Sequence, residues 1–165
     1  MAKESSFDIV SSVDIQEVDN AFGQTKKEMS QRYDLKGTGA AIEFDKSAKT
    51  ITITAPADFV VGQIQDILTT KLLRRGIDLQ ALKWGKNENA SGGNVRRSAV
   101  IVEGIDRDSA SAINKDIKAQ KFKAKVQIDG DKLRVSSASR DTLQEVIAFV
   151  KSNDYGLPLQ FVNYR

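Results

Sequence analysis

Apolar and polar residues alternate along two neighbouring stretches in the first half of the chain. In residues 40–45 and again in residues 50–55, every second position is apolar and the positions between are polar or small. This alternation predicts two strands that each bury one face. From Asp58, which can cap a helix, apolar residues recur at helical spacing until Gly76. The pattern therefore predicts a hairpin followed by an amphipathic helix that packs on the apolar face of the hairpin.

The same order of elements returns in the second half. A strand is predicted at 99–102, and a helix capped by Asp106 follows it. Asp-Gly-Asp at 129–131 is typical of a hairpin turn between two further strands. A helix that begins after Ser139 and a strand at 159–164 complete the series.

The first half has a matching start, with a strand at 7–10 and a helix capped by Asp14. The order strand, helix, strand, strand, helix, strand thus occurs twice. It predicts an α+β fold of two ferredoxin-like (βαββαβ) modules that arose by duplication. Each module would have a four-stranded sheet with helices on one face and an open second face. Residues 85–94, rich in glycine, asparagine and serine, are expected to form a mobile linker.

Composition narrows the chemistry. The 165 residues include no cysteine and no histidine, which excludes disulfides and thiolate metal sites and removes the commonest general base. No apolar run reaches the length of a membrane span, and no apolar segment resembling a secretion signal follows Met1. A cytoplasmic protein without a membrane partner is therefore expected. Residues 91–165 hold 13 basic and 9 acidic residues, a modest positive excess that indicates an anionic partner.

The open sheet face of the second module is predicted to be basic. If Ala124, Val126 and Ile128 point inward, their neighbours point outward, and the outward set includes Lys123, Lys125, Lys132, Arg134 and one of Arg96 and Arg97. Such a face suits phosphates. Lysine-rich faces also keep sheets soluble without binding a ligand, and both interpretations stay open.

Other basic and aromatic residues lie outside these strands. Arg32 and Lys36 flank Asp34 in a loop that ends in glycine, where side-chain charge and backbone N–H groups can hold phosphate. Arg74 and Arg75 lie at the end of a predicted helix. Their favourable interaction with the helix dipole is enough to explain basic residues at this position. The third strand of neither module carries an aromatic, so any base stacking must come from residues whose expected role is core packing: Tyr33, Trp84, Tyr155, Phe161 and Tyr164.

Several short segments occur in the same order and at the same spacing as in a known protein family. They are Ser-Phe-Asp-Ile-Val-Ser at 6–11, Arg-Tyr-Asp-Leu-Lys-Gly at 32–37, Lys-Leu-Leu-Arg-Arg-Gly-Ile at 71–77, Ser-Arg-Asp at 139–141 and Leu-Pro-Leu-Gln-Phe-Val-Asn-Tyr-Arg at 157–165. From end to end, the chain resembles the YajQ family of bacterial proteins.

The resemblance implies that the first strands of the two modules are exchanged. Residues 4–10 would join residues 106–165 in the second module, and residues 95–102 would join residues 11–84 in the first, with 85–94 as the linker. Neither half could then fold alone, because each sheet would need a strand from the other half.

The family looks like a set of nucleotide-binding proteins. Purine nucleotides, transfer RNA and, for some members, cyclic di-GMP with transcriptional control are linked to it, and no catalytic role is established for it. The resemblance and the basic face together predict the residues that contact a nucleotide or RNA: Arg32, Asp34, Lys36, Lys71, Arg74, Arg75, Lys123, Lys125, Arg134, Arg140, Asp141, Phe161, Asn163, Tyr164 and Arg165.

Three functional hypotheses follow. The first is a non-catalytic protein that binds a purine nucleotide, a cyclic dinucleotide or RNA through basic loops and the open basic sheet face. The second is an adaptor that pairs its sheet edges with a partner such as a transcription regulator, with nucleotide binding weak or incidental. The third, an enzyme, is disfavoured because only carboxylates, lysines or a bound metal could carry the chemistry. No metal site and no cofactor are predicted, and the sequence leaves the oligomeric state open.

Overall fold

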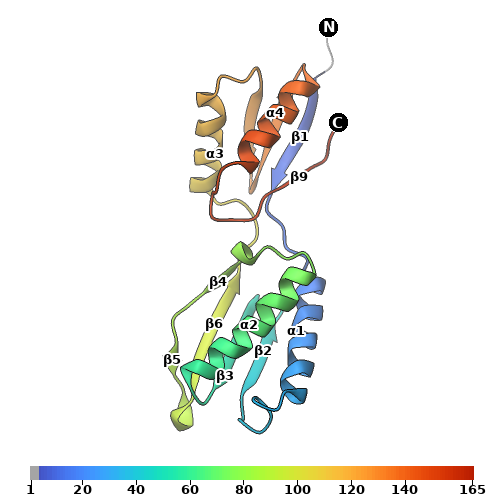
Figure 1. Ribbon diagram of the computed structural model, residues 1–165. Helices are drawn as coiled ribbons and strands as arrows, with labels where there is room; N and C mark the ends of the chain where they lie inside the picture. The colour runs from blue at the N-terminus through green and yellow to red at the C-terminus, as the bar shows by residue number, and fades with distance from the viewer. Residues whose placement is uncertain (1–3) are drawn as a thin grey trace. The chain divides into compact units, whose positions relative to one another are not determined.

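The computed structural model describes residues 4–165, which form two compact units (Figure 1). One unit is Val13–Val102, and the other joins the described residues up to Ser12 to Glu103–Arg165. Within residues 4–165, no helix combines the length and the apolar character needed to cross a bilayer.

The unit of residues 13–102 has an antiparallel sheet with the strand order β2-β3-β6-β4, and β5 pairs with β6. Helices α1 and α2 pack side by side in this unit (Figure 1). Its elements are α1 (Ile15–Gln31), β2 (Ala41–Asp45), β3 (Thr50–Ala55), α2 (Asp58–Arg74), the short 3-10 helix η1 (Leu79–Ala81), β4 (Leu82–Trp84), β5 (Glu88–Asn89), the short 3-10 helix η2 (Ser91–Gly93) and β6 (Val95–Ile101).

Local sequence patterns account for most of these elements. Asp14 caps α1 as predicted, accepting hydrogen bonds from two backbone N–H groups of the first turn. In β3 the two isoleucines are buried and the threonines are partly exposed, as the alternation predicts. The prediction that Asp58 caps α2 is wrong: Ala57 holds the cap position without a side-chain hydrogen bond, and Asp58 lies inside the first turn. There its charge complements the helix dipole.

The second unit has an antiparallel sheet with the strand order β7-β8-β1-β9. Its helices α3 and α4 pack against each other, and α4 packs on β8 and β1. Its elements are β1 (Ser5–Val10), α3 (Arg107–Ala119), β7 (Lys125–Asp129), β8 (Lys132–Ser137), α4 (Arg140–Lys151) and β9 (Gln160–Val162).

The core of this second unit depends on the strand at the start of the chain. Phe7 and Ile9 of β1 are fully buried, and Phe7 lies opposite Val135 of β8. Ser139 caps α4, and the face of α4 that contains Val146 is buried as predicted. Ile128 was expected to point into the core but is 42% exposed, because β7 is an edge strand and Ile128 lies near its hairpin end.

In one sheet the strand next to the hairpin is distant in the sequence from its partners, and in the other that strand follows its partners in the chain. β1 pairs with β8 and β9, whereas β6 pairs with β3 and β4. The chain passes from one unit to the other at residues 12–13 and 102–103, so residues 85–94 do not connect the units. They lie within one unit, and the stretch that was predicted as a mobile linker contains β5 and η2. In β5, Glu88 and Asn89 pair with Arg96 and Val95 at the start of β6.

The two units share an order of elements. In each sheet a hairpin forms one edge, β6 or β1 comes next, and a short strand that follows the second helix forms the other edge. The ferredoxin-like classification, the origin by duplication and the domain boundaries given above stay predictions.

Candidate functional site

The residues predicted to contact a ligand lie in three places. A first set lies on α1 and α2 and at their ends, a second lies on the open face of the sheet that contains β7 and β8, and a third surrounds the end of the chain next to α4. Lys36 lies apart from all three, in the loop between α1 and β2.

Arg32 and Asp34, in the first set, bind each other. Arg32 Nε donates to Asp34 Oδ1 at 3.0 Å, and Arg32 Nη2 donates to Oδ2 at 2.7 Å. Gln63 of α2 donates to the same carboxylate at 3.0 Å. The hydrogen bonds from Arg32 hold the pKa of Asp34 below its usual value. This cluster therefore ties the loop after α1 to α2.

Two more cations of the first set bridge the same helices. Lys71 Nζ lies 3.0 Å from Glu28 Oε1, and Arg75 Nη1 lies 3.3 Å from Glu17 Oε1. The backbone N–H of Arg75 also caps α2 by donating to carbonyls of its last turn. These contacts give Lys71 and Arg75 a structural role.

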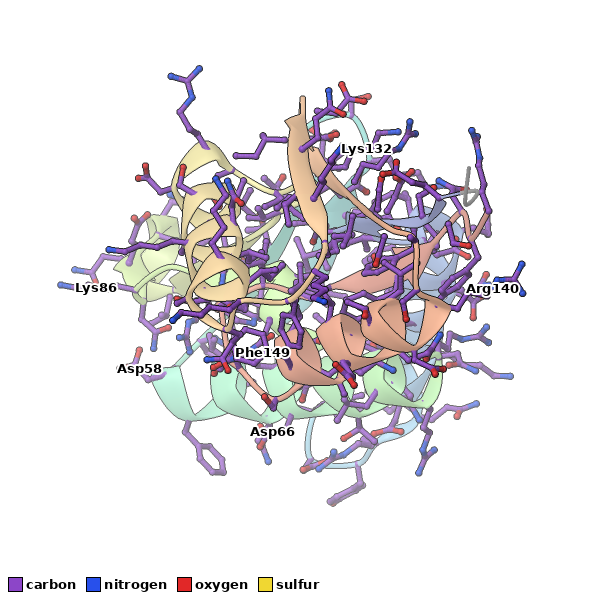
Figure 2. All side chains as sticks on the ribbon, turned by 90° about the horizontal axis from the view of Figure 1, so that it is seen from above. Asp58, Asp66, Lys86, Lys132, Arg140 and Phe149 are labelled. Atoms are coloured by element: carbon purple, nitrogen blue, oxygen red, sulfur yellow. The ribbon has the colours of Figure 1, made fainter. Side chains whose placement is uncertain are left out.

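Arg74 differs from its neighbours because it has no carboxylate partner among residues 4–165. It lines a groove of about 260 Å³ between α1 and α2, together with Arg32, Glu28 and Asp66. Asp66 extends outward from α2 (Figure 2). Arg32 and Lys71, the other cations of this groove, are already paired with carboxylates, which weakens the attraction of the groove for phosphate.

The open face of the second sheet carries a buried carboxylate. Asp8 of β1 is only 2% exposed and alternates with the core residues Phe7 and Ile9, so it lies on the face away from the core. Arg134 Nε donates to Asp8 Oδ1 at 3.1 Å, and Lys132 Nζ lies 3.7 Å from Oδ2. This face is therefore not the uniformly basic surface that was expected, because β1 brings a negative charge to its centre.

The remaining basic residues predicted for this face are exposed or lie elsewhere. Lys123 precedes β7 and is exposed, and Lys125 Nζ makes a long contact of 3.8 Å with Glu4, which contributes little in solvent. Arg96 and Arg97 belong to β6 in the other unit, so neither joins this face, which corrects that prediction.

The pKa of Asp8 results from opposing effects. Burial disfavours the charged form and by itself would raise the pKa. Hydrogen bonds from Asn163 and Arg134, and the charges of Arg134 and Lys132, outweigh burial, so the pKa lies below the ordinary value of 3.8. Ionised Asp8 therefore stabilises the fold above that ordinary value, and the stabilisation is lost as the pH falls through the lowered pKa.

Replacing Asp8 with asparagine is expected to lower the free energy of unfolding by about 1.5 kcal/mol near neutral pH, the contribution of a hydrogen bond to a charged group. Because Asp8 becomes neutral in acid, the difference between Asp8→Asn and the unmodified protein should shrink toward about pH 3. Urea unfolding at both pH values measures this. Glu43→Gln, a change to an exposed carboxylate on β2, is the control. A difference that stays constant with pH would contradict the assignment.

The residues after β9 continue alongside β1. Val162 is the partner of Asp8, and further along Ser6 and Arg165 exchange two backbone hydrogen bonds of 3.1 and 2.9 Å. Asn163 and Tyr164 therefore lie opposite the single residue Phe7 of β1, and this arrangement is a β-bulge.

The bulge sets the direction of the side chains that follow it. Asn163 has a φ of 57°, a left-handed conformation that asparagine adopts more readily than most residues, and its Nδ2 donates to Asp8 at 2.9 Å. Tyr164 comes next and is 59% exposed, with its ring centre 6.2 Å from that of Phe7. Phe161, before the bulge, packs edge-on against Phe7 in the core.

A pocket of about 310 Å³, here called the C-terminal pocket, lies beside this segment. It is lined by Ser5, Ser6, Arg140, Leu143, Gln144, Tyr164 and Arg165. Arg140 is the first residue of α4 and extends away from the helix (Figure 2). Asp141 lies in the first turn of α4, where it complements the helix dipole, and does not line the pocket.

The lining of the C-terminal pocket has a distinct chemistry. It combines two arginines with an exposed phenol ring, two serine hydroxyls and one amide, and none of the lining side chains is acidic. Arginine binds anions through paired N–H donors, and an exposed aromatic ring offers a flat stacking surface. The arrangement suits an anion that is attached to a flat ring.

Ser5, Ser6 and Gln144 are pocket residues that the sequence did not single out. The two serines reach the pocket only because β1 lies beside the end of the chain. Gln144 follows Arg140 by four positions on α4, which places both on one helix face. That spacing was the feature of the sequence from which Gln144 could have been predicted as a neighbour of Arg140.

The aromatic candidates divide into a partly buried group and an exposed group. Core packing is confirmed for Trp84, Tyr155 and Phe161, which pack against the two cores. The Tyr155 hydroxyl donates to Asp116 at 2.8 Å, and burial together with this hydrogen bond raises its pKa. The prediction is wrong for Tyr33, which is 97% exposed, and for Tyr164. Both lie outside helices and strands, where periodicity does not predict burial.

Acidic residues at the turns serve the backbone. Asp106 accepts a hydrogen bond from the Ser109 N–H at 3.1 Å, and its hydrogen bonds with Ser109 lower its pKa. Across residues 4–165, no three acidic side chains gather closely enough to hold a metal ion.

Comparison with known proteins covers nearly the whole chain. The family model described as nucleotide-binding protein YajQ-like matches residues 5–165. A protein of Alkaliphilus oremlandii named nucleotide-binding protein is 48% identical over the full length of both chains. One of Geotalea uraniireducens with the same name is 49% identical over 97% of this chain and 98% of its own length. One of Bacillus mycoides is 46% identical over the full length of both. The chain therefore belongs to the family of nucleotide-binding proteins described as YajQ-like.

Proposed function

We propose that this protein binds a purine nucleotide without catalysis, and that the C-terminal pocket is the site. The observation that carries the proposal is the convergence on one pocket of Arg140 at the start of α4 and of Tyr164 and Arg165 at the end of the chain, beside the serines of β1. The names of the relatives, nucleotide-binding protein, support the same ligand class.

Each part of a nucleotide has a suitable partner in the pocket. The guanidinium groups of Arg140 and Arg165 match the geometry and charge of phosphate. The exposed ring of Tyr164 provides a surface for the base. Gln144 and the serine hydroxyls can donate and accept hydrogen bonds at the polar edges of a base or sugar.

The volume of the pocket favours one nucleotide unit over a stacked run of bases. A pocket of about 310 Å³ lies at the small end of ligand sites. RNA or a cyclic dinucleotide would place one nucleotide in the pocket and the rest outside it. The proposal is therefore for a mononucleotide such as GTP, and a cyclic dinucleotide or RNA is a weaker fit.

The lining supports binding rather than turnover. No lining side chain of the described pocket is a carboxylate, and the chain has no histidine or cysteine that could act as general base or nucleophile. Arginines stay protonated and cannot accept a proton at neutral pH. A bound nucleotide would meet cations and hydrogen-bond donors but no group that activates water.

Calorimetric titration with GTP, cyclic di-GMP and a short single-stranded RNA at low salt tests the proposal. We expect GTP to bind most tightly and its affinity to fall as salt is raised, because phosphate contacts are screened. Tyr164→Ala should weaken binding about tenfold, the effect of losing one stacking ring. Tyr33→Ala, which removes a ring that is 97% exposed in the other unit, should change nothing.

Two outcomes would contradict the proposed site. If none of the three ligands binds, the chain is not a nucleotide-binding protein of this kind. If GTP binds equally well to Tyr164→Ala, the nucleotide lies elsewhere.

A further inference from the structure

We propose that the free edge of β2 binds the carboxyl-terminal segment of an extended peptide that ends in an apolar residue. The site is a groove of about 600 Å³ between α1 and β2, here called the edge groove, which is also lined by residues of the loop that precedes β2. It belongs to the unit of residues 13–102, whereas the proposed nucleotide pocket belongs to the other unit. This activity is therefore separate from nucleotide binding.

β2 has backbone groups available for pairing. It is the edge strand of its sheet, with β3 on one side and no strand on the other among the described residues. At such an edge, alternate residues direct N–H and C=O groups outward, where an added strand can bind them. Ala41 and Glu43 from one face of β2 and Ile42 from the other all line the groove, so the groove runs over the edge of the strand.

The floor of the groove is apolar. Met29 of α1, Leu35 of the loop and Ile42 of β2 line it, and all three are nearly covered by the protein. An aliphatic side chain would bury further apolar surface against them. No arginine and no aromatic residue lines the edge groove, so it lacks the partners that favour nucleotides in the C-terminal pocket.

The loop that lines the groove before β2 can hold an anion. Gly37 and Gly39 of this loop line the groove with φ values of 83° and 77°, and their backbone N–H groups have no acceptor within residues 4–165. Lys36 belongs to the same loop, and Lys26 of α1 lines the groove as well; neither lysine has a carboxylate partner among residues 4–165. Unpaired N–H groups in a turn, with cations beside them, form an anion-binding concavity of the kind that captures a peptide carboxylate.

The order of these features sets the direction of the peptide. The loop immediately precedes β2, so a carboxylate at the loop requires a strand that runs antiparallel to β2. Successive side chains would then alternate between the apolar floor and the open side where Glu43 lies. Glu43 is exposed and has no cationic partner among the described residues. The groove therefore favours an apolar last residue preceded by a basic one.

Titration of fluorescein-labelled hexapeptides tests this inference. The probes share the body Ser-Thr-Lys-Val-Lys and end in Val, Leu, Ile or Phe with a free carboxylate, and amidated copies serve as chemical controls. At least one free acid should bind, and its amide should bind at least about tenfold more weakly, the loss expected for one charged hydrogen bond. The NMR signals of the Gly37 and Gly39 amides should shift with the acid.

A matched pair of variants locates the site. Lys36→Glu reverses a charge in the groove and should weaken binding of the free acid at least about tenfold. Lys27→Glu makes the same change on an exposed lysine of α1 outside the groove and should have no effect. Arg140→Glu should also leave peptide binding unchanged, which separates this result from that of the nucleotide pocket.

Three results would overturn the inference. The first is that no probe binds at about 1 mM, the weak limit of useful recognition. The second is equal binding of acids and amides, which would remove the role of the loop. The third is a shift of the Gly37 and Gly39 signals by GTP and not by any peptide, which would make the edge groove a nucleotide site.

Discussion

Replacing Phe7 with alanine is expected to lower the free energy of unfolding by about 3–5 kcal/mol, the usual cost of removing a buried phenylalanine ring. Phe7 is fully buried in β1, and its ring contacts those of Phe161 and Tyr164. Its loss would leave a cavity in the core that also holds Leu133 and Val146. Because β1 comes from the start of the chain, a change at residue 7 should loosen elements more than 100 positions away.

Amide hydrogen exchange measures which elements lose stability when Phe7 is replaced. In Phe7→Ala, exchange should accelerate most in β8, β9 and α4, which contact or share the core of β1, and less in β3. Phe59→Ala removes the same ring from a position that is 74% exposed and should change stability by less than about 0.5 kcal/mol. Equal acceleration in β2 and β3 would contradict the assignment of β1 to the second unit.

Reversing the charge at Arg140 is expected to weaken GTP binding about 100-fold, because a charged hydrogen bond is lost and a negative group then faces the phosphate. Arg140 lines the C-terminal pocket, and its Nε makes only a long contact of 3.5 Å with Ser5 Oγ. The side chain can therefore turn toward a ligand without breaking a strong bond. Calorimetric titration of Arg140→Glu with GTP measures the loss.

A matched control exists on the neighbouring helix. Arg107 is the first residue of α3, as Arg140 is of α4, and it does not line the C-terminal pocket. Arg107→Glu makes the same charge change at the same helical position, so it reproduces any general effect on net charge. Equal loss of GTP affinity in Arg140→Glu and Arg107→Glu would show that binding depends on the net charge of the protein and that the phosphate does not contact Arg140.

Some residues of the candidate site were predicted from the sequence, but the neighbours of others were not. Arg140, Tyr164 and Arg165 came from family resemblance, and the structure brings them together around one pocket. Arg134 was inferred from alternation along β8, which predicts the face of a residue but not its neighbour on the next strand. That neighbour is Asp8, about 126 positions earlier in the chain, and its carboxylate binds the guanidinium.

Local patterns in the sequence determined the helices, the strands and most of their caps. A period of two or of 3.6 residues records which positions face the core, and a capping side chain bonds to backbone groups only a few residues away. Asp14, Asp106 and Ser139 illustrate this, because each accepts a hydrogen bond from the first turn of its own helix.

Only the tertiary structure decided which strands share a sheet and what the sheets place side by side. Pairing between distant segments depends on the packing of whole faces, and alternation within one strand is compatible with more than one partner. The assignment of β1 to β8 and β9 placed Asp8 between Arg134 and Asn163 and created the bulge that exposes Tyr164. The C-terminal pocket exists because β1 and the segment after β9 lie together, a long-range contact that no local pattern records.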